Sequence, residues 1–256
     1  MPHIHFLQEG QGPTVVLSHA LGCDLSMWDG VAAALREHFT VLRYDHRGHG
    51  RSPASGGAFT MDDLADDAAR LIEAECQGPV HFVGLSMGGM TAQALGARRP
   101  DLVRSLAIAN SAMHYPPEAR AMWQTRVDTV LAQGVPAIAE GALQRWFTPA
   151  FREDAAQGQA LVAQLRDVLV RSDAAAYAAA CQAVAAIDLA AGNARITCPT
   201  LVIAGTLDEA TPPAMSDAMV QSIPGARLQQ LSAAHLSAVE QPEAFAALLT
   251  AFWASC

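Results

Sequence analysis

The 256-residue sequence has few of the features that mark secreted, zinc-binding or membrane proteins. Its five cysteines are widely spaced, and they form neither a CxxC pair nor a Cys/His ligand pattern. This spacing argues against a disulfide framework or a structural zinc site and favours a reducing cytoplasm. The first ten residues, MPHIHFLQEG, lack the basic region and apolar core of a signal peptide.

Long apolar runs and an excess of positive charge are also missing. The longest apolar stretch, residues 173–191, is mostly alanine and is interrupted by Gln182 and Asp188, so it predicts a helix of a water-soluble protein rather than a membrane span. The net charge of −9 argues against nucleic acid or an anionic membrane surface as the main partner. The sequence leaves the oligomeric state open, a homo-oligomer included.

The first 110 residues instead show a regular alternation of two patterns. Short runs rich in β-branched residues predict strands at 14–18, 40–44, 80–83 and 102–109, and helical patterns at 29–39 and 61–75 lie between them. A further strand is expected near the N-terminus, with His3 and His5 at its surface. Such alternation predicts an α/β fold with a mostly parallel, doubly wound sheet, in which ligands bind beyond the carboxyl ends of the strands.

The alternation stops at residue 111 and resumes near residue 198. Residues 111–197 are mostly helical, and they are followed by strands at 199–208 and 226–232 and a helix at 243–253. We interpret residues 1–110 and 198–256 as one core and residues 111–197 as a helical cap. In this interpretation the cap is an insertion over the active edge of the sheet, not an independent domain.

The segment Gly84-Leu85-Ser86-Met87-Gly88 has the pattern G-x-S-x-G. It follows a predicted strand and precedes a predicted helix at 90–98, which is the context of a nucleophile elbow. A serine on such a sharp turn is exposed at the end of the strand, and the nearby glycines avoid collisions with adjacent elements. The alternative is an ordinary tight turn that needs small residues.

A nucleophilic serine requires a base and an orienting carboxylate, which follow it in this chain order. His235 is the one histidine after the helical insertion, and it lies just after the last predicted strand. Asp208 ends the preceding strand, where a carboxylate meets a histidine from the next loop. The weaker alternatives are His114 for the base and Glu209 or Asp188 for the acid.

Two loops near the serine also carry expectations. The backbone N–H groups of Met87 and of Leu21, or alternatively Gly22, are expected to form an oxyanion hole, in which one donor is typically worth about 10²–10³ in rate. The stretch RYDHRGHGRS, residues 43–52, lacks the spacing and the lysine of a phosphate-binding loop. We interpret it as a turn braced by aspartate and arginine, and we expect no metal.

Taken in order, the motifs HALG, YDHRGHG, GLSMGG, AGTLDEATPP and AAHLSAVEQP resemble those of the α/β-hydrolase family over nearly the whole chain. At closer range the sequence is similar to the 3-oxoadipate enol-lactonases of aromatic catabolism, above all through RWFTPAF, residues 145–151, which lies in the variable insertion. One departure is Ala20, where many relatives have glycine. The resemblance implies a cofactor-free reaction with Ser86 as nucleophile, Asp208 as acid and His235 as base.

The resemblance further implies a serine hydrolase that opens 3-oxoadipate enol-lactone to 3-oxoadipate through an acyl-enzyme. The free carboxylate of such a substrate needs a partner, and Arg126 and Arg145 are the candidates, with Trp123 and Trp146 as apolar walls. For each arginine the alternative is a solvated helix face. The rival functions are a broad carboxylesterase, a cofactor-free perhydrolase or haloperoxidase-like hydrolase on the same triad, and a non-catalytic binding protein.

Overall fold

A computed structural model describes residues 4–54 and 56–256 of the chain. Seven strands form one sheet in the order β1-β3-β2-β4-β5-β6-β7. All neighbouring strands are parallel except β1, which pairs antiparallel with β3 at one edge. The strands are β1 (Phe6–Gly10), β2 (Thr14–Ser18), β3 (Thr40–Tyr44), β4 (Val80–Leu85), β5 (Val103–Ala109), β6 (Thr200–Gly205) and β7 (Arg227–Leu231).

Helices connect the strands and form the long insertion between β5 and β6. The α-helices are α1 (Asp29–Leu35), α2 (Met61–Glu75), α3 (Met87–Arg98), α4 (Pro117–Gln133), α5 (Pro136–Trp146), α6 (Pro149–Glu153), α7 (Gly158–Val170), α8 (Ala174–Ala185), α9 (Ala190–Asn193), α10 (Pro213–Ser222), α11 (Ser237–Glu240) and α12 (Pro242–Trp253). Two short 3-10 turns, η1 (Leu25–Trp28) and η2 (Pro100–Leu102), precede α1 and β5.

The central strands are buried along nearly their whole length. Every residue of β4 and of β6 is buried, as expected for parallel strands covered on both faces. The strands predicted at 14–18 and 40–44 and the helix predicted at 61–75 match the structure to the residue. Helix α2 begins where Thr60 and Asp63 form a reciprocal capping box, which satisfies backbone N–H groups at the helix start.

The strand expected around His3 and His5 is placed differently. It begins at Phe6, and His5 precedes it, half-buried, with its backbone N–H donating to Ser52 Oγ at 2.9 Å. His5 therefore lies just before the strand rather than in it, and it is half-buried because its backbone also pairs with Asp45 and Ser52 after β3. His3 lies outside the described residues.

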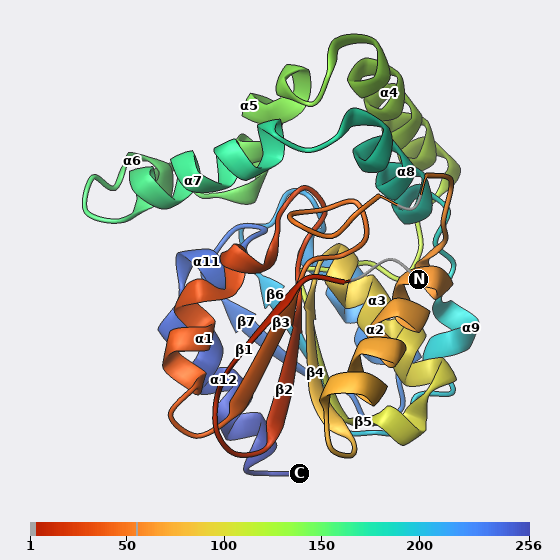
Figure 1. Cartoon of the computed structure of the whole chain (residues 1–256), viewed down its shortest axis with the longest axis vertical. Helices are drawn as coiled ribbons and strands as arrows, with labels where there is room; N and C mark the ends of the chain where they lie inside the picture. Colours follow the sequence, from red (N-terminus) through yellow and green to blue (C-terminus); the bar gives the residue numbers. More distant parts are fainter. Residues whose placement is uncertain (1–3, 55) are drawn as a thin grey trace.

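Helices cover both faces of the sheet. Helices α1 and α12 lie on one face, and α2 and α3 lie on the other, so the core has three layers (Figure 1). Helices α4 to α8 form a separate layer beyond the sheet edge at which β2, β4 and β6 end (Figure 1). The predicted α/β fold with a mostly parallel, doubly wound sheet is therefore confirmed.

The two ends of the insertion lie side by side at its base. His114 and Asp188 form an isolated antiparallel bridge, and the Leu189 backbone N–H donates to Met113 O at 2.8 Å. A second attachment lies farther along the cap, where the Leu236 N–H donates to Trp146 O at 3.0 Å. There Glu240 also accepts hydrogen bonds from the backbone N–H and the hydroxyl of Thr148.

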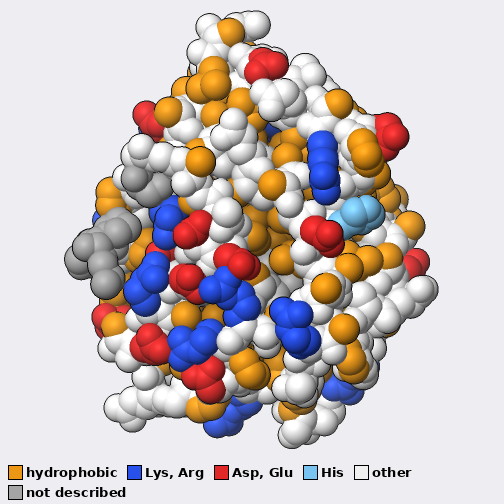
Figure 2. All heavy atoms as spheres, turned by 90° about the vertical axis from the view of Figure 1, so that its right-hand side faces the viewer, with side chains coloured by type: hydrophobic (Ala, Val, Ile, Leu, Met, Phe, Trp, Pro, Cys, Tyr) orange, Lys and Arg blue, Asp and Glu red, His pale blue; other side chains and the backbone are white. Residues whose placement is uncertain are grey.

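Basic and acidic side chains are mixed on the face that carries α2 and α3 (Figure 2). Arg98 pairs there with Asp62 and Asp66, and Arg99 pairs with Glu73 and Asp101. This face is therefore not a one-sign surface of the kind that attracts nucleic acid. Within the described ranges, no helix has the length and apolar character that crossing a membrane requires.

Candidate active site

Ser86 lies on the sharp turn between β4 and α3, in a backbone conformation that serine rarely adopts. Its φ is 58° and its ψ is −115°, and it is one of only two non-glycine residues with positive φ in the described ranges. Glycine is required on both sides, because a Cβ on Gly84 would collide with Gly88 and a Cβ on Gly88 would collide with Ser18 of β2. Steric crowding thus fixes the turn and presents the half-buried serine at its tip.

Asp208 and His235 meet at the ends of neighbouring strands. His235 Nδ1 lies 2.9 Å from Asp208 Oδ2, and both side chains are almost completely buried. Because a carboxylate accepts here, Nδ1 is the protonated nitrogen of the neutral ring, and Nε2 is left to accept a proton. Asp208 also accepts from the backbone N–H groups of Ala210 and Thr211 and from the Thr211 hydroxyl.

This network keeps Asp208 ionised. Burial alone raises the pKa of Asp208, but the positive charge of protonated His235 and the hydrogen bonds from His235, Thr211 and Asn110 outweigh burial and bring the pKa to about 2. The carboxylate therefore stays negative wherever the protein is folded near neutral pH. Such a group can orient the imidazole and stabilise its protonated form.

The alternatives raised by the sequence lie elsewhere. Glu209 faces the cavity described below, and the described hydrogen bonds join Asp208 rather than Glu209 to His235. His114 and Asp188 bridge each other at the base of the cap. In the described part of the chain Ser86 Oγ makes no hydrogen bond, so its contact with the histidine is not formed here; in hydrolases such contacts often tighten only with substrate bound.

The loop after β2 is held by a buried histidine that the sequence analysis did not assign. His19 Nδ1 donates to Ala20 O at 2.8 Å, and His19 Nε2 accepts from the His46 backbone N–H at 2.9 Å. This donor–acceptor pattern fits one neutral tautomer, and burial lowers the pKa of His19 to about 4. The ring therefore acts as a fixed, uncharged brace at physiological pH.

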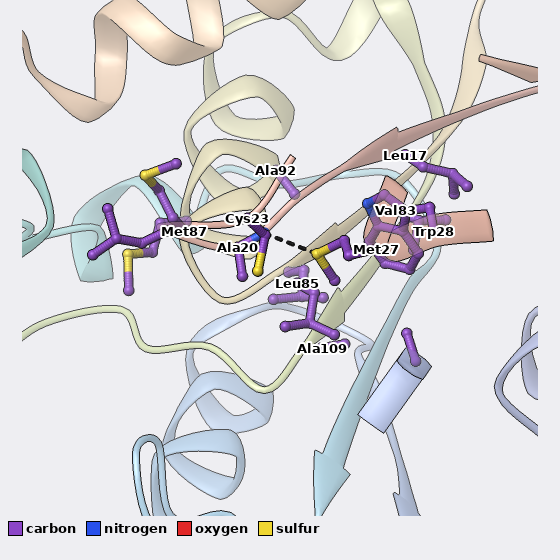
Figure 3. Close-up of a cluster of buried hydrophobic side chains, with 14 of the residues drawn as sticks. Leu17, Ala20, Cys23, Met27, Trp28, Val83, Leu85, Met87, Ala92 and Ala109 are labelled. Carbon is purple, nitrogen blue, oxygen red and sulfur yellow. Dashed lines mark hydrogen bonds between the residues drawn. The ribbon is translucent and has the colours of Figure 1, made fainter. Parts of the chain in front are cut away.

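The same loop packs on a sulfur-rich part of the core. Ala20 and Cys23 lie near Met87, and Met27 lies on their other side, beside Leu85 (Figure 3). The Ala20 N–H donates to Met27 Sδ at 3.3 Å. Ala20 does not adopt positive φ, so alanine fits at this position without strain.

The two expected oxyanion donors come from the start of α3 and from the loop after β2. Met87 is buried as the first residue of α3, and Leu21 is buried in the loop. Neither backbone N–H donates to another group in the ranges that the structure describes. Gly22 has a φ of 76°, and a Cβ there would lie 2.7 Å from Leu169 and 3.0 Å from Tyr177 of the cap, so the cap presses directly on this loop.

A cavity of about 620 Å³ lies between the cap and the sheet edge. Its lining includes His235 and Leu21 from the core, together with all four residues predicted to bind substrate. Ser86, Met87 and Asp208 are not part of the lining. The four predicted residues are Trp123, Arg126, Arg145 and Trp146.

Two arginines, against the single carboxylate of Glu209, give the lining of this cavity a net positive charge. The Arg126 guanidinium lies 4.9 Å from the centre of the Trp123 ring, in a cation–π arrangement, and Tyr115 packs edge-on against the same ring at 5.9 Å. Burial and the nearby charge of Arg126 lower the pKa of Arg145. Neither arginine forms an ion pair within the described residues.

The turn after β3 has the braced form that the sequence predicts. Asp45 accepts from the backbone N–H groups of Leu25 and Arg51, both at 2.8 Å, and Arg47 Nε donates to Asp67 at 2.5 Å. Among the described residues, no group of three or more His, Cys, Asp or Glu side chains is placed to hold a metal ion.

A family model described as the alpha/beta hydrolase fold matches residues 13–134. The chain belongs to this α/β-hydrolase family. The 3-oxoadipate enol-lactonase 2 of Acinetobacter baylyi is 38% identical to it over 233 residues, which are 91% of this chain and 85% of that protein.

Two solved structures extend the similarity to three dimensions. The enol-lactonase of Burkholderia xenovorans LB400 superposes with a TM-score of 0.93 at 39% identity and covers 98% of this chain and 96% of its own. The malate-bound thermophilic esterase of Thermogutta terrifontis gives a TM-score of 0.91 at 28% identity, with 98% and 93% covered. Family and relatives together identify a hydrolase of carboxylic esters, the class that includes lactonases.

Proposed function

We propose that this chain is a serine hydrolase that opens a small carboxylated enol-lactone, 3-oxoadipate enol-lactone, to 3-oxoadipate through an acyl-enzyme. The observation that carries the proposal is a cationic, aromatic cavity between the cap and the edge that holds His235. The similarity to the Acinetobacter baylyi enol-lactonase supports the substrate class.

The mechanism follows from the donors and acceptors at the sheet edge. His235 Nε2 takes the proton of Ser86 as the Ser86 oxygen attacks the lactone carbonyl, and Asp208 stabilises the protonated ring through Nδ1. The Met87 and Leu21 N–H groups hold the oxyanion, with the positive end of α3 behind them. The lactone C–O bond breaks, His235 returns the proton to the enol oxygen, and water activated by His235 then releases the acid.

Substrate selection belongs to the cap in this proposal. Arg126 holds the substrate carboxylate, because its guanidinium lies in the cavity without a carboxylate partner among the described residues. Trp123 and Trp146 form apolar walls. Arg145 is the second candidate, and its nearness to Arg126 gives the cavity a positive potential that attracts an anionic substrate.

A substrate panel tests the proposal. Purified enzyme is assayed with 3-oxoadipate enol-lactone, with p-nitrophenyl acetate and butyrate, and for peracid formation from acetate and peroxide. The proposal requires kcat/KM for the lactone to exceed that for the simple esters. A ratio of one or below would instead identify a broad carboxylesterase, and dominant peracid formation would identify a perhydrolase.

The proposal also covers the division of the chain into core and cap and the cellular compartment of the enzyme. Residues 111–197 act as the cap and the remaining residues as the core, with the Met113–Leu189 pairing at the base of the cap. A cytoplasmic location is supported by the five free cysteines. The partner is a small-molecule lactone or ester, with no cofactor, and a homo-oligomer is possible.

A further inference from the structure

The segment Ala109–Ser111, at the end of β5, makes hydrogen bonds to Ser86, to Asp208 and to Ala234 beside His235. The Ser86 backbone N–H donates to Ala109 O at 2.9 Å, and the Ser111 hydroxyl donates to Ser86 O at 2.8 Å. Between these two contacts, the side chain of Asn110 extends away from the serine towards Asp208. One short turn therefore joins the nucleophile elbow to the acid.

Asn110 is held in an uncommon conformation. It is completely buried, and with a φ of 45° it is the second non-glycine residue of positive φ in the described ranges, beside Ser86. Strained backbone of this kind persists where surrounding contacts over-determine it, and it is common at functional sites. Its carboxamide passes over β6 so closely that a Cβ on Gly205 would lie 2.7 Å from Asn110 Nδ2.

The hydrogen bonds of Asn110 fix the direction of its amide. Nδ2 donates to Asp208 Oδ2 at 2.9 Å and to Ala234 O at 3.3 Å, and Oδ1 accepts from the Ser237 hydroxyl at 2.6 Å. The two acceptors, Asp208 Oδ2 and Ala234 O, require an NH₂ group, and the Ser237 hydroxyl requires an oxygen to accept its hydrogen bond. A neutral amide meets this requirement, whereas an ionised carboxylate would repel Asp208.

We propose that Asn110 is a positioning residue that holds the Asp208 carboxylate and the His235 loop in one fixed relation. Oδ2, the atom of Asp208 that accepts from His235, receives the Asn110 bond as well, and Ala234 precedes the histidine directly. The inference rests on the proposed triad. Of the two residues with positive φ, Ser86 is the proposed nucleophile, and this inference gives the other, Asn110, a role in catalysis without proton transfer.

The sharpest test is Asn110→Asp. The titratable groups near this place are Asp208, His235 and Tyr115. At low pH the introduced carboxyl group shares a proton with Asp208 and donates as the amide did, whereas at higher pH both groups ionise and repel. We expect kcat for p-nitrophenyl acetate to fall as pH rises from 6 to 9, a decline that the wild-type enzyme does not show.

Asn110→Gly provides the second variant. Glycine accepts positive φ without strain, so it removes the carboxamide and leaves the backbone relaxed. We expect kcat to fall roughly 10-fold to 100-fold, as for other groups that orient catalytic ligands, with KM changed less than about twofold. Circular dichroism and the thermal midpoint verify that both variants fold.

The matched control is Asn193→Asp. Asn193 is equally buried and donates to Gln93 and Ser222 between α3, α9 and α10, away from the triad. This variant is expected to lower the thermal midpoint without adding a pH-dependent decline of kcat. If Asn193→Asp reproduced the decline, the effect would reflect a buried charge in general and the inference would be wrong.

The outcomes separate the two proposals. Wild-type turnover and labelling of Ser86 by a serine-reactive phosphonate are measured first, and their absence would overturn the proposed function. With wild-type activity established, Asn110→Gly at wild-type kcat, or Asn110→Asp with the wild-type pH profile, would overturn the positioning role alone. If Asn110→Asp does not fold, the kcat of Asn110→Gly decides.

Discussion

The backbone at Ser86 cannot relax without loss of the turn that presents the side chain. Its positive φ is stabilised by neighbouring glycines, by the Ala109 carbonyl and by the Ser111 hydroxyl. A strained non-glycine residue of this kind is unfavourable by about 1–3 kcal/mol. The close contacts that Gly84 and Gly88 make possible hold the turn in this conformation.

Ser86→Ala is expected to abolish hydrolysis. In well-measured triads, loss of the nucleophile lowers kcat by about 10⁶, because neither base nor acid can act without it. Steady-state assays with lactone and ester, together with phosphonate labelling followed by intact mass, measure the effect. Turnover of the alanine variant within 100-fold of wild type would contradict the acyl-enzyme mechanism.

Asp208 also links stability to pH. Its folded pKa of about 2 lies below the ordinary 3.8, so the ionised carboxylate stabilises the fold above about pH 4 by about 2 kcal/mol. That contribution is lost as pH falls from about 4 to about 2. Urea unfolding at pH 6, 4, 3 and 2 is expected to show this loss in the wild type and not in Asp208→Asn. If the free energies of unfolding of the two proteins changed in parallel with pH, the lowered pKa of Asp208 would be contradicted.

Arg126→Gln tests the carboxylate partner. Loss of the guanidinium is expected to raise KM for the carboxylated lactone at least 10-fold, as for removal of a charge-assisted hydrogen bond, and to leave KM for neutral esters unchanged. Arg166→Gln is the matched control, because Arg166 pairs with Glu140 on the cap and does not line the cavity. Equal effects on charged and neutral substrates would remove the proposed role.

At the scale of elements, the cap is attached to the loop that carries His235. The Leu236–Trp146 backbone bond and the Thr148–Glu240 pair connect the end of α5 to α11, which begins two residues after the histidine. Trp146, a wall of the cavity, therefore keeps a fixed distance from the base. In the proposed mechanism, the same contacts would therefore set both the size of the substrate and the position of the base.

Thr148→Val is expected to lower the free energy of unfolding by about 1–2 kcal/mol. The variant keeps the side-chain volume but loses the hydroxyl bond to Glu240 and the cap of α6 at Phe151. Thr250→Val, at an exposed site on α12 where the hydroxyl contacts only its own helix, serves as control. Urea unfolding measures both. An equal change in the two variants would show that the attachment adds nothing.

Much of this architecture was predictable from the sequence, because burial on both faces leaves continuous apolar strands. The ends of β2 and β3 and the positions of Asp208 and His235 follow from that pattern and from chain order. The first strand was misplaced, because its exposed edge residues lack the pattern. Asn110 was not assigned, because a positive φ and a contact with a residue 98 positions away leave no local signal.

At the scale of the whole molecule, cap and core should unfold together. The cap has its own buried residues, yet its two ends pair with each other at Met113–Leu189, and the Trp146–Leu236 bond joins it to the core. Trp28 and Trp253 report on the core, and Trp123 and Trp146 report on the cap. Two double variants, Trp28→Phe/Trp253→Phe and Trp123→Phe/Trp146→Phe, leave tryptophans only in the cap or only in the core. In each variant, urea unfolding followed by tryptophan fluorescence should have the same midpoint as unfolding followed by circular dichroism. A separate early transition of the cap tryptophans would show independent unfolding.

The attachment of the cap to the segment after His235 limits how this scaffold can diversify. A cap grafted from a relative would have to pair its own two ends, as Met113 and Leu189 do, and also present a carbonyl and a threonine to the Leu236–Glu240 segment. A graft that met only the first demand would lose the contacts that hold the segment after His235, the proposed general base. New substrate preferences are therefore easier to reach by point substitutions on the cavity side of α4, which takes no part in these contacts, than by exchange of whole caps.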